Sequence, residues 1–323
     1  MRVLITGATG FVAHTLIPEL LKRGEEVRGA VRSASVESIE CVRVGAIDSG
    51  TDWRAALKDV DAVIHLAARV HVMRDRVADP LEAFRRVNVD GTRRLAEQAA
   101  EVGVRRFIFL SSIKAMSEDG ALENSSALTE ALLIRPDSPY GQSKWEAEQT
   151  LFEISDRTGL DVVIFRPPLV YGPGVKGNFL SLLKLCRSGA PLPLGAINNR
   201  RSLVYIENLV DALICGLHHP KVSGERFLVC DGEALSTTAL VRHLRSAMEQ
   251  PARLFSVSPG LLRRAARCIG REAVWRRLAG SLEIDDRKFR TLTNWRPPFS
   301  AETGLQKTVS WFLTSETENR IEK

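Results

Sequence analysis

The sequence predicts an α/β protein in which a doubly wound parallel sheet is followed by a smaller, mainly helical lobe. Three observations support this fold class. Short apolar runs alternate with helix-like segments in the first half of the chain, a glycine-rich turn follows the first run, and the alternation stops at Gly172-Pro173-Gly174. We therefore expect one domain over residues 1–171 and a second over 172–323, with parts of 200–230 returning to the first.

The first predicted strand, Arg2 to Thr6, is apolar and leads into a predicted helix from Gly10 to Arg23. Asp79-Pro80 and Ser138-Pro139 each fit a helix cap followed by proline at the first helical position. The other predicted strands are 26–31, 41–45, 61–66, 105–111 and 161–166, and the other helices of the first domain are 51–58, 80–102 and 139–158. The second lobe has predicted helices at 178–188, 207–218, 236–249, 260–279 and 300–313.

Composition excludes several classes of protein. The chain has 323 residues, of which 44% are hydrophobic and 26% charged, as in an ordinary globular protein. The net charge of +6 is spread along the chain and forms no basic patch interleaved with aromatics, so we expect no nucleic-acid partner. Five scattered cysteines without CxxC spacing favour reduced thiols in the cytoplasm and no metal site. We expect neither a signal peptide nor a transmembrane segment.

The turn after the first strand carries a glycine fingerprint for a dinucleotide. Gly7, Gly10 and Ala13 hold its three positions, which serve the tight turn, the approach of backbone to a pyrophosphate, and helix–strand packing. A plain strand–helix connection is the simpler interpretation, but the position at the first β–α junction favours a cofactor. The residues expected to contact this cofactor are Gly7, Thr9, Gly10, Phe11 and Val12.

The end of the second predicted strand indicates which dinucleotide binds. NAD sites usually place a carboxylate there for the ribose 2′-hydroxyl, whereas this chain has Arg32, which suits a 2′-phosphate. We therefore predict NADP(H) over NAD(H). Asp48, after the third strand, is positioned to accept a hydrogen bond from the adenine amino group, although it also fits an ordinary turn with Ser49 and Gly50.

Ser112 and the pair Tyr140 and Lys144 are the candidate catalytic residues. Residues four apart on a helix share one face, so Tyr140 and Lys144 can point at the same substrate atom. A lysine charge lowers the pKa of a nearby phenol, which is ordinarily about 10, and makes the phenol a usable acid or base. The order glycine turn, serine at a strand end and Tyr-x-x-x-Lys indicates a hydride-transfer enzyme.

Taken in order, these motifs resemble the extended short-chain dehydrogenase/reductase family, which includes nucleotide-sugar epimerases, dehydratases and reductases. The resemblance implies a Rossmann-type sheet and a homodimer, and it covers nearly the whole chain. The matching segments are Thr6 to Phe11, His65 to Ala68, Asn88, Phe109 to Ser112, Tyr140 to Lys144, Arg166 to Pro173, Arg201 to Asp211 and Leu292 to Pro297.

The resemblance also implies roles for single residues. Ser112 would hydrogen-bond the substrate oxygen, Tyr140 would donate or accept the proton, and Lys144 would hold the nicotinamide ribose. The walls of the cofactor cleft would be Leu66, Ala67 and Ala68, with Pro168, Leu169 and Val170 against the nicotinamide. The substrate contacts implied for a UDP-sugar are Asn178, Arg201 and Arg276 or Arg277.

Several reactions stay open. A 4,6-dehydratase would carry an Asp-Glu pair after its catalytic serine or threonine, whereas Ser112 is followed by Ile113 and Lys114, which argues against dehydration. Lys114 could assist a substrate carbonyl or acyl group, or lie on a loop surface. We favour an NADP(H)-dependent reductase of a UDP-4-keto-6-deoxy-hexosamine for surface polysaccharide synthesis. The alternatives are a UDP-sugar 4-epimerase with retained NAD, a dihydroflavonol-type reductase and a non-catalytic dinucleotide sensor.

The stretch from Leu261 to Leu278 is rich in arginine. Its simplest interpretation is a helix that covers the substrate lobe. Contact with an acidic partner or an anionic membrane surface is the alternative.

Overall fold

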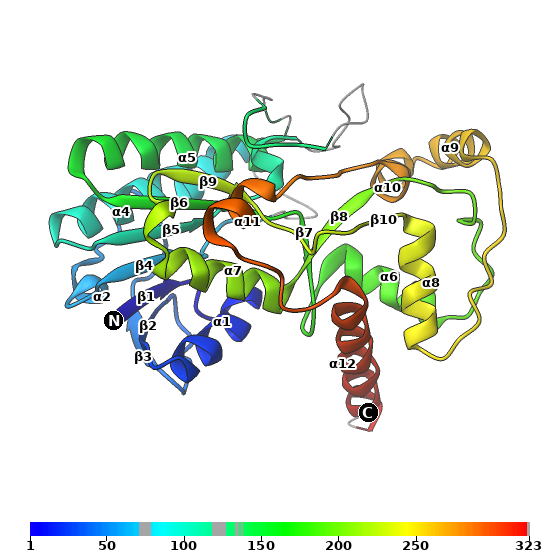
Figure 1. Ribbon diagram of the computed structural model, residues 1–323, viewed down its shortest axis with the longest axis horizontal. Helices are drawn as coiled ribbons and strands as arrows, with labels where there is room; N and C mark the ends of the chain where they lie inside the picture. The colour runs from blue at the N-terminus through cyan, green and yellow to red at the C-terminus, as the bar shows by residue number, and fades with distance from the viewer. Residues whose placement is uncertain (71–78, 118–126, 133–135, 137, 322–323) are drawn as a thin grey trace.

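The computed structural model describes residues 1–323 apart from 71–78, 118–126, 133–135, 137 and 322–323. Its main sheet has seven parallel strands in the order β3-β2-β1-β4-β5-β6-β9 (Figure 1). This confirms the predicted doubly wound α/β class. The strands are β1 (Arg2–Thr6), β2 (Glu26–Val31), β3 (Glu40–Arg43), β4 (Ala62–His65), β5 (Arg106–Leu110), β6 (Asp161–Arg166) and β9 (Glu225–Leu228).

Helices cover both faces of this sheet because side chains alternate along each strand. Val3 and Ile5 of β1 pack into one core with α1 (Phe11–Lys22) and α7 (Ile206–His218). Leu4, between them, packs into a second core on the opposite face. The elements on that second face are α2 (Arg54–Leu57), α3 (Pro80–Arg85), the π-helical turn η1 (Arg86–Asp90), α4 (Gly91–Glu101) and α5 (Pro139–Thr158).

The second lobe contains a small sheet that the sequence did not predict. Its strands are β7 (Leu169–Tyr171), β8 (Arg201–Tyr205) and β10 (Ala234–Leu235), in the order β10-β8-β7. Runs of two to five residues are too short to show a clear strand period. The helices of this lobe are α6 (Gly177–Arg187), α8 (Thr237–Ala247), α9 (Pro259–Cys268), α10 (Glu272–Ala279) and α12 (Ala301–Ile321). By contrast, α11 (Arg287–Thr293) packs beside β9, and its Phe289 lies in the first core of the main sheet. The short 3₁₀ turn η3 (Pro220–Val222) precedes β9.

Two predicted helices are interrupted. The segment 260–279 forms α9 and α10 because Gly270 adopts a φ of +68° between them. The segment 80–102 contains η1 between α3 and α4, which adds a wider turn inside the helical run. None of the helices in the described ranges is long and apolar enough to cross a bilayer.

Candidate active site

The glycine turn after β1 fits the diphosphate of a dinucleotide. Gly7 has a φ of +66°, and a Cβ there would lie only 3.0 Å from the backbone nitrogen of Ala67. Gly10 donates its N–H to the carbonyl of Gly7 at 2.8 Å and is the N-cap of α1, with no side chain capping that helix. The N–H groups at the start of α1 therefore suit a phosphate, which the partial positive charge of the helix terminus also favours.

His65, at the end of β4, anchors the chain segment next to the glycine turn. Its ring nitrogens lie 2.6 Å from the hydroxyl of Thr6 and 2.9 Å from that of Thr92. The same Thr6 hydroxyl accepts the N–H of Ala67 at 3.1 Å. Burial lowers the pKa of His65 to about 3, assisted by the charge of Lys144, so the imidazole is neutral at physiological pH. This network holds the segment from Leu66 to Ala68, where the sequence predicts cofactor contacts.

Ser112 lies directly after β5, at the start of the 3₁₀ turn η2 (Ile113–Ala115). Its hydroxyl is partly exposed and accepts the N–H of Lys114 at 3.2 Å. Ile113 donates its N–H to the carbonyl of Pro167 at 2.9 Å, which ties the turn to the segment after β6. The catalytic candidate therefore lies on a turn held from two sides at the carboxyl edge of the sheet.

Tyr140 and Lys144 lie in the first two turns of α5. Lys144 is 2% exposed, and its ammonium group donates to the carbonyl of Leu110 at 2.8 Å, above the ring of Phe109 at 4.3 Å. Burial lowers the pKa of Lys144 to about 7, although the charge of Glu148 acts in the opposite direction. Tyr140 is half-buried and packs edge-on against Phe84, with the ring centroids 5.9 Å apart.

A close backbone approach brings α5 and the Ser112 turn together. Ser138 caps α5 by accepting the N–H of Gly141 at 3.1 Å. A Cβ on Gly141 would overlap the carbonyl oxygen of Lys114. Glycine is therefore required at this position for the first turn of α5 to pack directly on η2. The structure thus places Ser112, Tyr140 and Lys144 on three neighbouring turns.

Asn88, which the sequence analysis named only as a matching residue, connects two parts of the site. It lies in η1, is 1% exposed, and donates its side-chain N–H to the hydroxyl of Ser143 at 2.9 Å and to the carbonyl of Arg69 at 3.0 Å. Its side-chain oxygen accepts the N–H of Arg69 at 2.8 Å. Asn88 thereby joins the segment after β4 to α5. No sequence pattern indicates a π-helical turn, so this function was not predictable.

Glu148 is a second buried residue behind the site that the sequence analysis missed. It is fully buried, forms an ion pair with Arg166 and accepts the hydroxyl of Ser111. Glu148 lies one helical turn after Lys144, so the spacing Tyr-x-x-x-Lys-x-x-x-Glu was the available signal. Because a buried carboxylate needs partners, this pair fixes α5 against β6 next to Ser112.

The remaining predicted cofactor residues lie around the carboxyl edge. Arg32 is exposed just beyond β2, and Asp48 accepts the N–H of Gly50 at 2.9 Å, which is the turn geometry considered above. Pro168 is buried and Leu169 is 44% exposed, so β7 presents side chains to solvent at this edge. Thr9 is exposed and Phe11 half-buried at the start of α1. Val12 and Val170 pack against both the first core of the main sheet and the separate core of the second lobe, which β7, β8, α6, α8 and α12 form.

The predicted substrate residues are on the second lobe. Arg201, in β8, donates to the carbonyls of Arg277 and Gly280, each at 2.9 Å, and so holds the end of α10. Arg276 is exposed on α10, and Asn178 is exposed in the first turn of α6. The structure therefore gives Arg201 a structural role, which the sequence analysis did not foresee, beside its predicted substrate contact.

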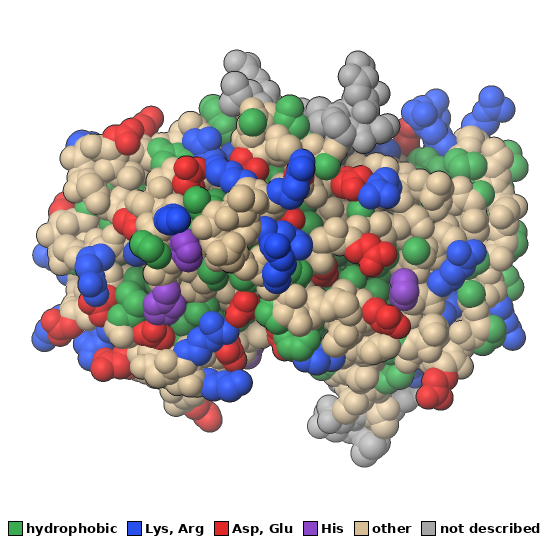
Figure 2. Space-filling view, in the orientation of Figure 1, with side chains coloured by type: hydrophobic (Ala, Val, Ile, Leu, Met, Phe, Trp, Pro, Cys, Tyr) green, Lys and Arg blue, Asp and Glu red, His purple; other side chains and the backbone are tan. Residues whose placement is uncertain are grey.

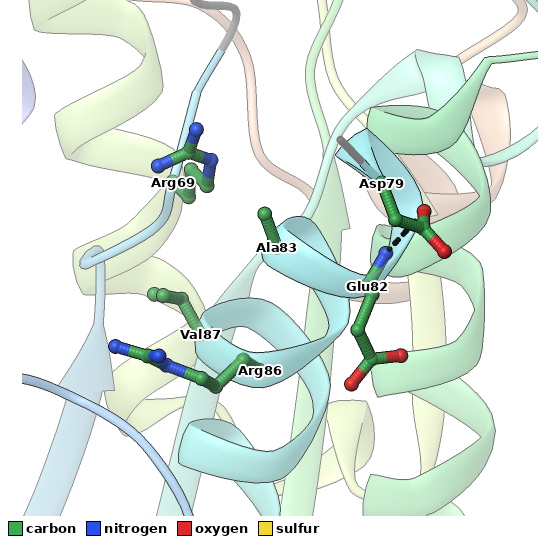
Figure 3. Close-up of a pocket in the computed structure, with 6 residues that line it drawn as sticks. All are labelled: Arg69, Asp79, Glu82, Ala83, Arg86 and Val87. Atoms are coloured by element: carbon green, nitrogen blue, oxygen red, sulfur yellow. Dashed lines mark hydrogen bonds between the residues drawn. The ribbon is translucent and has the colours of Figure 1, made fainter. Parts of the chain in front are cut away.

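A hollow of about 400 Å³ lies beside α3 and η1. Arg69, on the segment after β4, faces Ala83 and Val87 across it (Figure 3). None of the predicted site residues lines this hollow. We therefore build the candidate site from the carboxyl edge of the sheet.

Comparisons with known proteins agree with this arrangement. The sequence model of the NAD dependent epimerase/dehydratase family matches residues 3–230. A UDP-glucose 4-epimerase of Vibrio cholerae is 41% identical over 314 residues, which cover 96% of this chain and 95% of that protein. A UDP-glucose 4-epimerase of Mycolicibacterium smegmatis is 29% identical, with 97% and 98% covered.

Among solved structures, a UDP-glucuronic acid 4-epimerase of Bacillus cereus in complex with NAD superposes with a TM-score of 0.78. It is 23% identical, and the match covers 98% of this chain and 99% of that one. The likeness confirms the fold. With the family match over most of its length and the relative at 41% identity, this chain belongs to the NAD dependent epimerase/dehydratase family, within the short-chain dehydrogenase/reductase enzymes that its motifs indicated.

Proposed function

We propose that this enzyme is a UDP-sugar 4-epimerase that retains NAD. The observation that carries the proposal is the 41% identity, over 96% of the chain, to a protein named UDP-glucose 4-epimerase. The comparisons thus support the epimerase alternative better than the 4-keto reductase that the sequence analysis favoured. Both reactions use the same catalytic residues and differ in whether the hydride returns to the sugar that supplied it.

In this proposal Tyr140 exchanges a proton with the 4-oxygen of the sugar, and Ser112 hydrogen-bonds that oxygen. Lys144 supports the phenolate form of Tyr140 through its positive charge. Bound NAD would accept the hydride from C4 and return it to the other face of the sugar. Ser112 and Tyr140 hold the 4-oxygen in place while the keto sugar rotates to present its other face. They can do so because they come from two turns that pack directly together.

The cofactor residues fit NAD as well as NADP. The glycine turn and the amides of α1 recognise the diphosphate that both share. Arg32 can bind a 2′-phosphate, as the sequence analysis predicts, or stack on the adenine ring. We expect NAD because retention of one dinucleotide through both hydride transfers does not need a reducing pool. Release of nucleotide from the purified protein by heat, followed by chromatography, identifies the cofactor.

We place the UDP-sugar between the carboxyl edge of the main sheet and the second lobe. The residues assigned to the sugar nucleotide are Lys114, Asn178, Arg201 and Arg276. The same proposal takes residues 1–171 as the dinucleotide-binding domain and 172–323 as mainly the substrate-binding lobe. The arginines suit a diphosphate because guanidinium groups bind its oxygens through paired hydrogen bonds. We also propose a role in surface polysaccharide synthesis and a cytoplasmic location.

A homodimer through α3 to α5 completes the proposal. Trp145 on α5 is 39% exposed and Val102 at the end of α4 is 49% exposed, so this face offers apolar side chains. Light scattering during size-exclusion chromatography measures the mass. A monomer at all concentrations would contradict this part.

The test is incubation of the purified enzyme with UDP-glucose or UDP-N-acetylglucosamine, without added nucleotide, followed by proton NMR of the anomeric region. We expect conversion to the C4-inverted sugar. Tyr140→Phe should lower turnover by roughly 10² to 10⁴ and keep the bound nucleotide, whereas Trp145→Phe serves as the neighbouring control. Consumption of NADPH with UDP-4-keto-6-deoxy-N-acetylglucosamine, without inversion of either other sugar, would establish the reductase instead.

A further inference from the structure

Helix α9 lies at the outer edge of the second lobe (Figure 1). None of its ten residues is buried. Leu261 at one end is 61% exposed and Ile269, just past the other end, is 69% exposed. These are the two highest values among the large hydrophobic side chains that the structure describes. An apolar surface of this kind, held in water, marks a contact site.

The apolar and basic residues lie on different sides of α9. Because successive residues of an α-helix are about 100° apart, positions three and four apart share a face. Leu261, Ala265 and Cys268 follow this spacing, are exposed, and have Ile269 beside them. Arg263 and Arg267 lie on the far side of the helix, whereas Arg264, about 60° from Leu261 around the helix axis, flanks the apolar face, and all three are exposed. The partly covered face that turns toward the lobe contains Leu262 and Ala266.

Charge accompanies this apolar face along α9 and α10. Residues 259–280 contain six arginines and one glutamate, which gives a charge of 6 − 1 = +5. That glutamate, Glu272, lies 3.1 Å from Arg267 and 3.9 Å from Arg263, so it neutralises only part of the surface. Lys and Arg side chains project from the molecule over this region in Figure 2. The rest of the chain has a net charge of only +6 − 5 = +1.

Val274 on α10, 41% exposed, and Phe255 before α9, 48% exposed, are further exposed apolar side chains in this stretch of the chain. A second copy of this chain would bring two strongly positive surfaces together and is therefore disfavoured. Nucleic acid would satisfy the arginines but leave the leucine and isoleucine in water. An anionic bilayer satisfies both, because phosphate groups pair with the arginines while apolar side chains enter the boundary with the acyl chains.

We propose that α9, together with the start of α10, is a docking surface for an anionic phospholipid membrane. α9 lies parallel to the bilayer, with Leu261 and Ile269 inserted and Arg264 and Arg271 at the phosphate level. The contact is reversible and depends on salt, since one short helix and a few arginines supply it. The proposal is independent of the reaction that the enzyme catalyses.

The test uses the full-length protein and flotation with vesicles of phosphatidylglycerol and phosphatidylcholine in equal parts. We expect binding to these vesicles at low salt, little binding to phosphatidylcholine alone, and loss of binding at high salt. The apolar variant is Leu261→Asp with Ile269→Asp, which should lower the bound fraction at least tenfold. The matched control is Leu21→Asp with Leu185→Asp, which removes exposed leucines elsewhere and should bind like the wild type.

A second pair of variants isolates the charge. Arg264→Gln with Arg271→Gln should weaken the partitioning roughly tenfold or more, since each basic residue near a charged membrane contributes several-fold. Arg157→Gln with Arg242→Gln removes two exposed arginines from other helices and should have little effect. Circular dichroism of every variant checks that the fold is retained.

A fluorescent label gives an independent measurement of insertion. Cys268 is exposed on the apolar face of α9, and Cys41 and Cys215 are only partly exposed, so replacing the latter two by serine leaves one reactive site. An environment-sensitive label on Cys268 should shift to shorter wavelength with the anionic vesicles. No binding and no shift would overturn the proposal. Concentration-dependent self-association that the Leu261 and Ile269 variant abolishes would also overturn it, in favour of an interface between copies.

Discussion

Replacing Lys144 by methionine should change how the stability of the cofactor-free enzyme depends on pH. Lys144 is 2% exposed, and burial lowers its pKa from 10.5 to about 7. The unfolded chain, in which this lysine has its ordinary pKa, therefore binds more protons than the folded chain between these two values. Folding stability must rise with pH in that window. The methionine variant fills nearly the same volume and carries no proton.

The magnitude follows from the two pKa values. When the pH rises from about 7 to about 8.5, the titration of Lys144 alone raises the free energy of unfolding of the wild type by about 1.7 kcal/mol. Each pH unit well inside the window contributes about 1.4 kcal/mol. Urea denaturation at constant ionic strength, followed by tryptophan fluorescence, measures the free energy of unfolding at both pH values. The difference between wild type and Lys144→Met isolates this residue from the other titrating groups.

Lys184→Met, on the exposed face of α6, is the matched control and should keep the pH dependence of the wild type. An equal rise in the wild type and in Lys144→Met would refute the reasoning. It would mean that Lys144 keeps its ordinary pKa despite its burial.

Two further predictions test the surroundings of the site. The wild type should lose stability on acidification, because the pKa of His65 is lowered to about 3 in the folded protein. Each pH unit below about 6.5 then lowers the free energy of unfolding by about 1.4 kcal/mol. His65→Asn should remove this loss. Urea midpoints at two acidic pH values measure this, and an equal loss in the variant would contradict it. Gly141→Ala should lower turnover at least tenfold, since the new Cβ meets the Lys114 carbonyl and shifts the start of α5. Gly260→Ala, where a Cβ meets only a distant side chain, is the control.

The sequence predicted the elements that strong local patterns define. The glycine turn at Gly7 and the capped start of α5 at Ser138 lie where they were expected, because turn conformations and capping depend on residues close in the chain. The parallel sheet followed from the alternation of strands and helices, which gave six of its seven strands; β9 was not among the predicted strands. Local chemistry therefore accounts for the part of the site nearest the predicted cofactor.

The parts that depend on distant contacts were not predictable. The small sheet of the second lobe includes a strand of only two residues, Ala234–Leu235, which exists because β8 pairs with it. Arg201 came from a family motif as a phosphate ligand, yet it also bonds carbonyls more than seventy positions away. Asn88 contacts Ser143 across 55 positions through a π-helical turn. Such contacts belong to the folded arrangement, and no periodicity in the sequence encodes them.

Binding of the dinucleotide should take up a proton at Lys144. Glu148, one turn further along α5, raises the pKa of Lys144 only in part, because its carboxylate is already paired with Arg166 and hydrogen-bonded by Ser111. We expect the negative charge of a bound dinucleotide to supply further countercharge, which would favour the charged form of Lys144 that the proposed role of Tyr140 requires. At about pH 8 a group with a pKa of about 7 is about one-tenth protonated, so binding should take up nearly one proton.

Calorimetry in two buffers of different ionisation enthalpy measures this uptake directly. The wild type should show a binding enthalpy that changes with the buffer, and Lys144→Met should show a much smaller change. The uptake should also decrease as the pH falls below about 7, where Lys144 is already charged before the ligand arrives. A buffer-independent enthalpy in the wild type at about pH 8 would mean that Lys144 carries its charge without the ligand. Burial at the start of α5 would then not control the charge of the proposed catalytic pair.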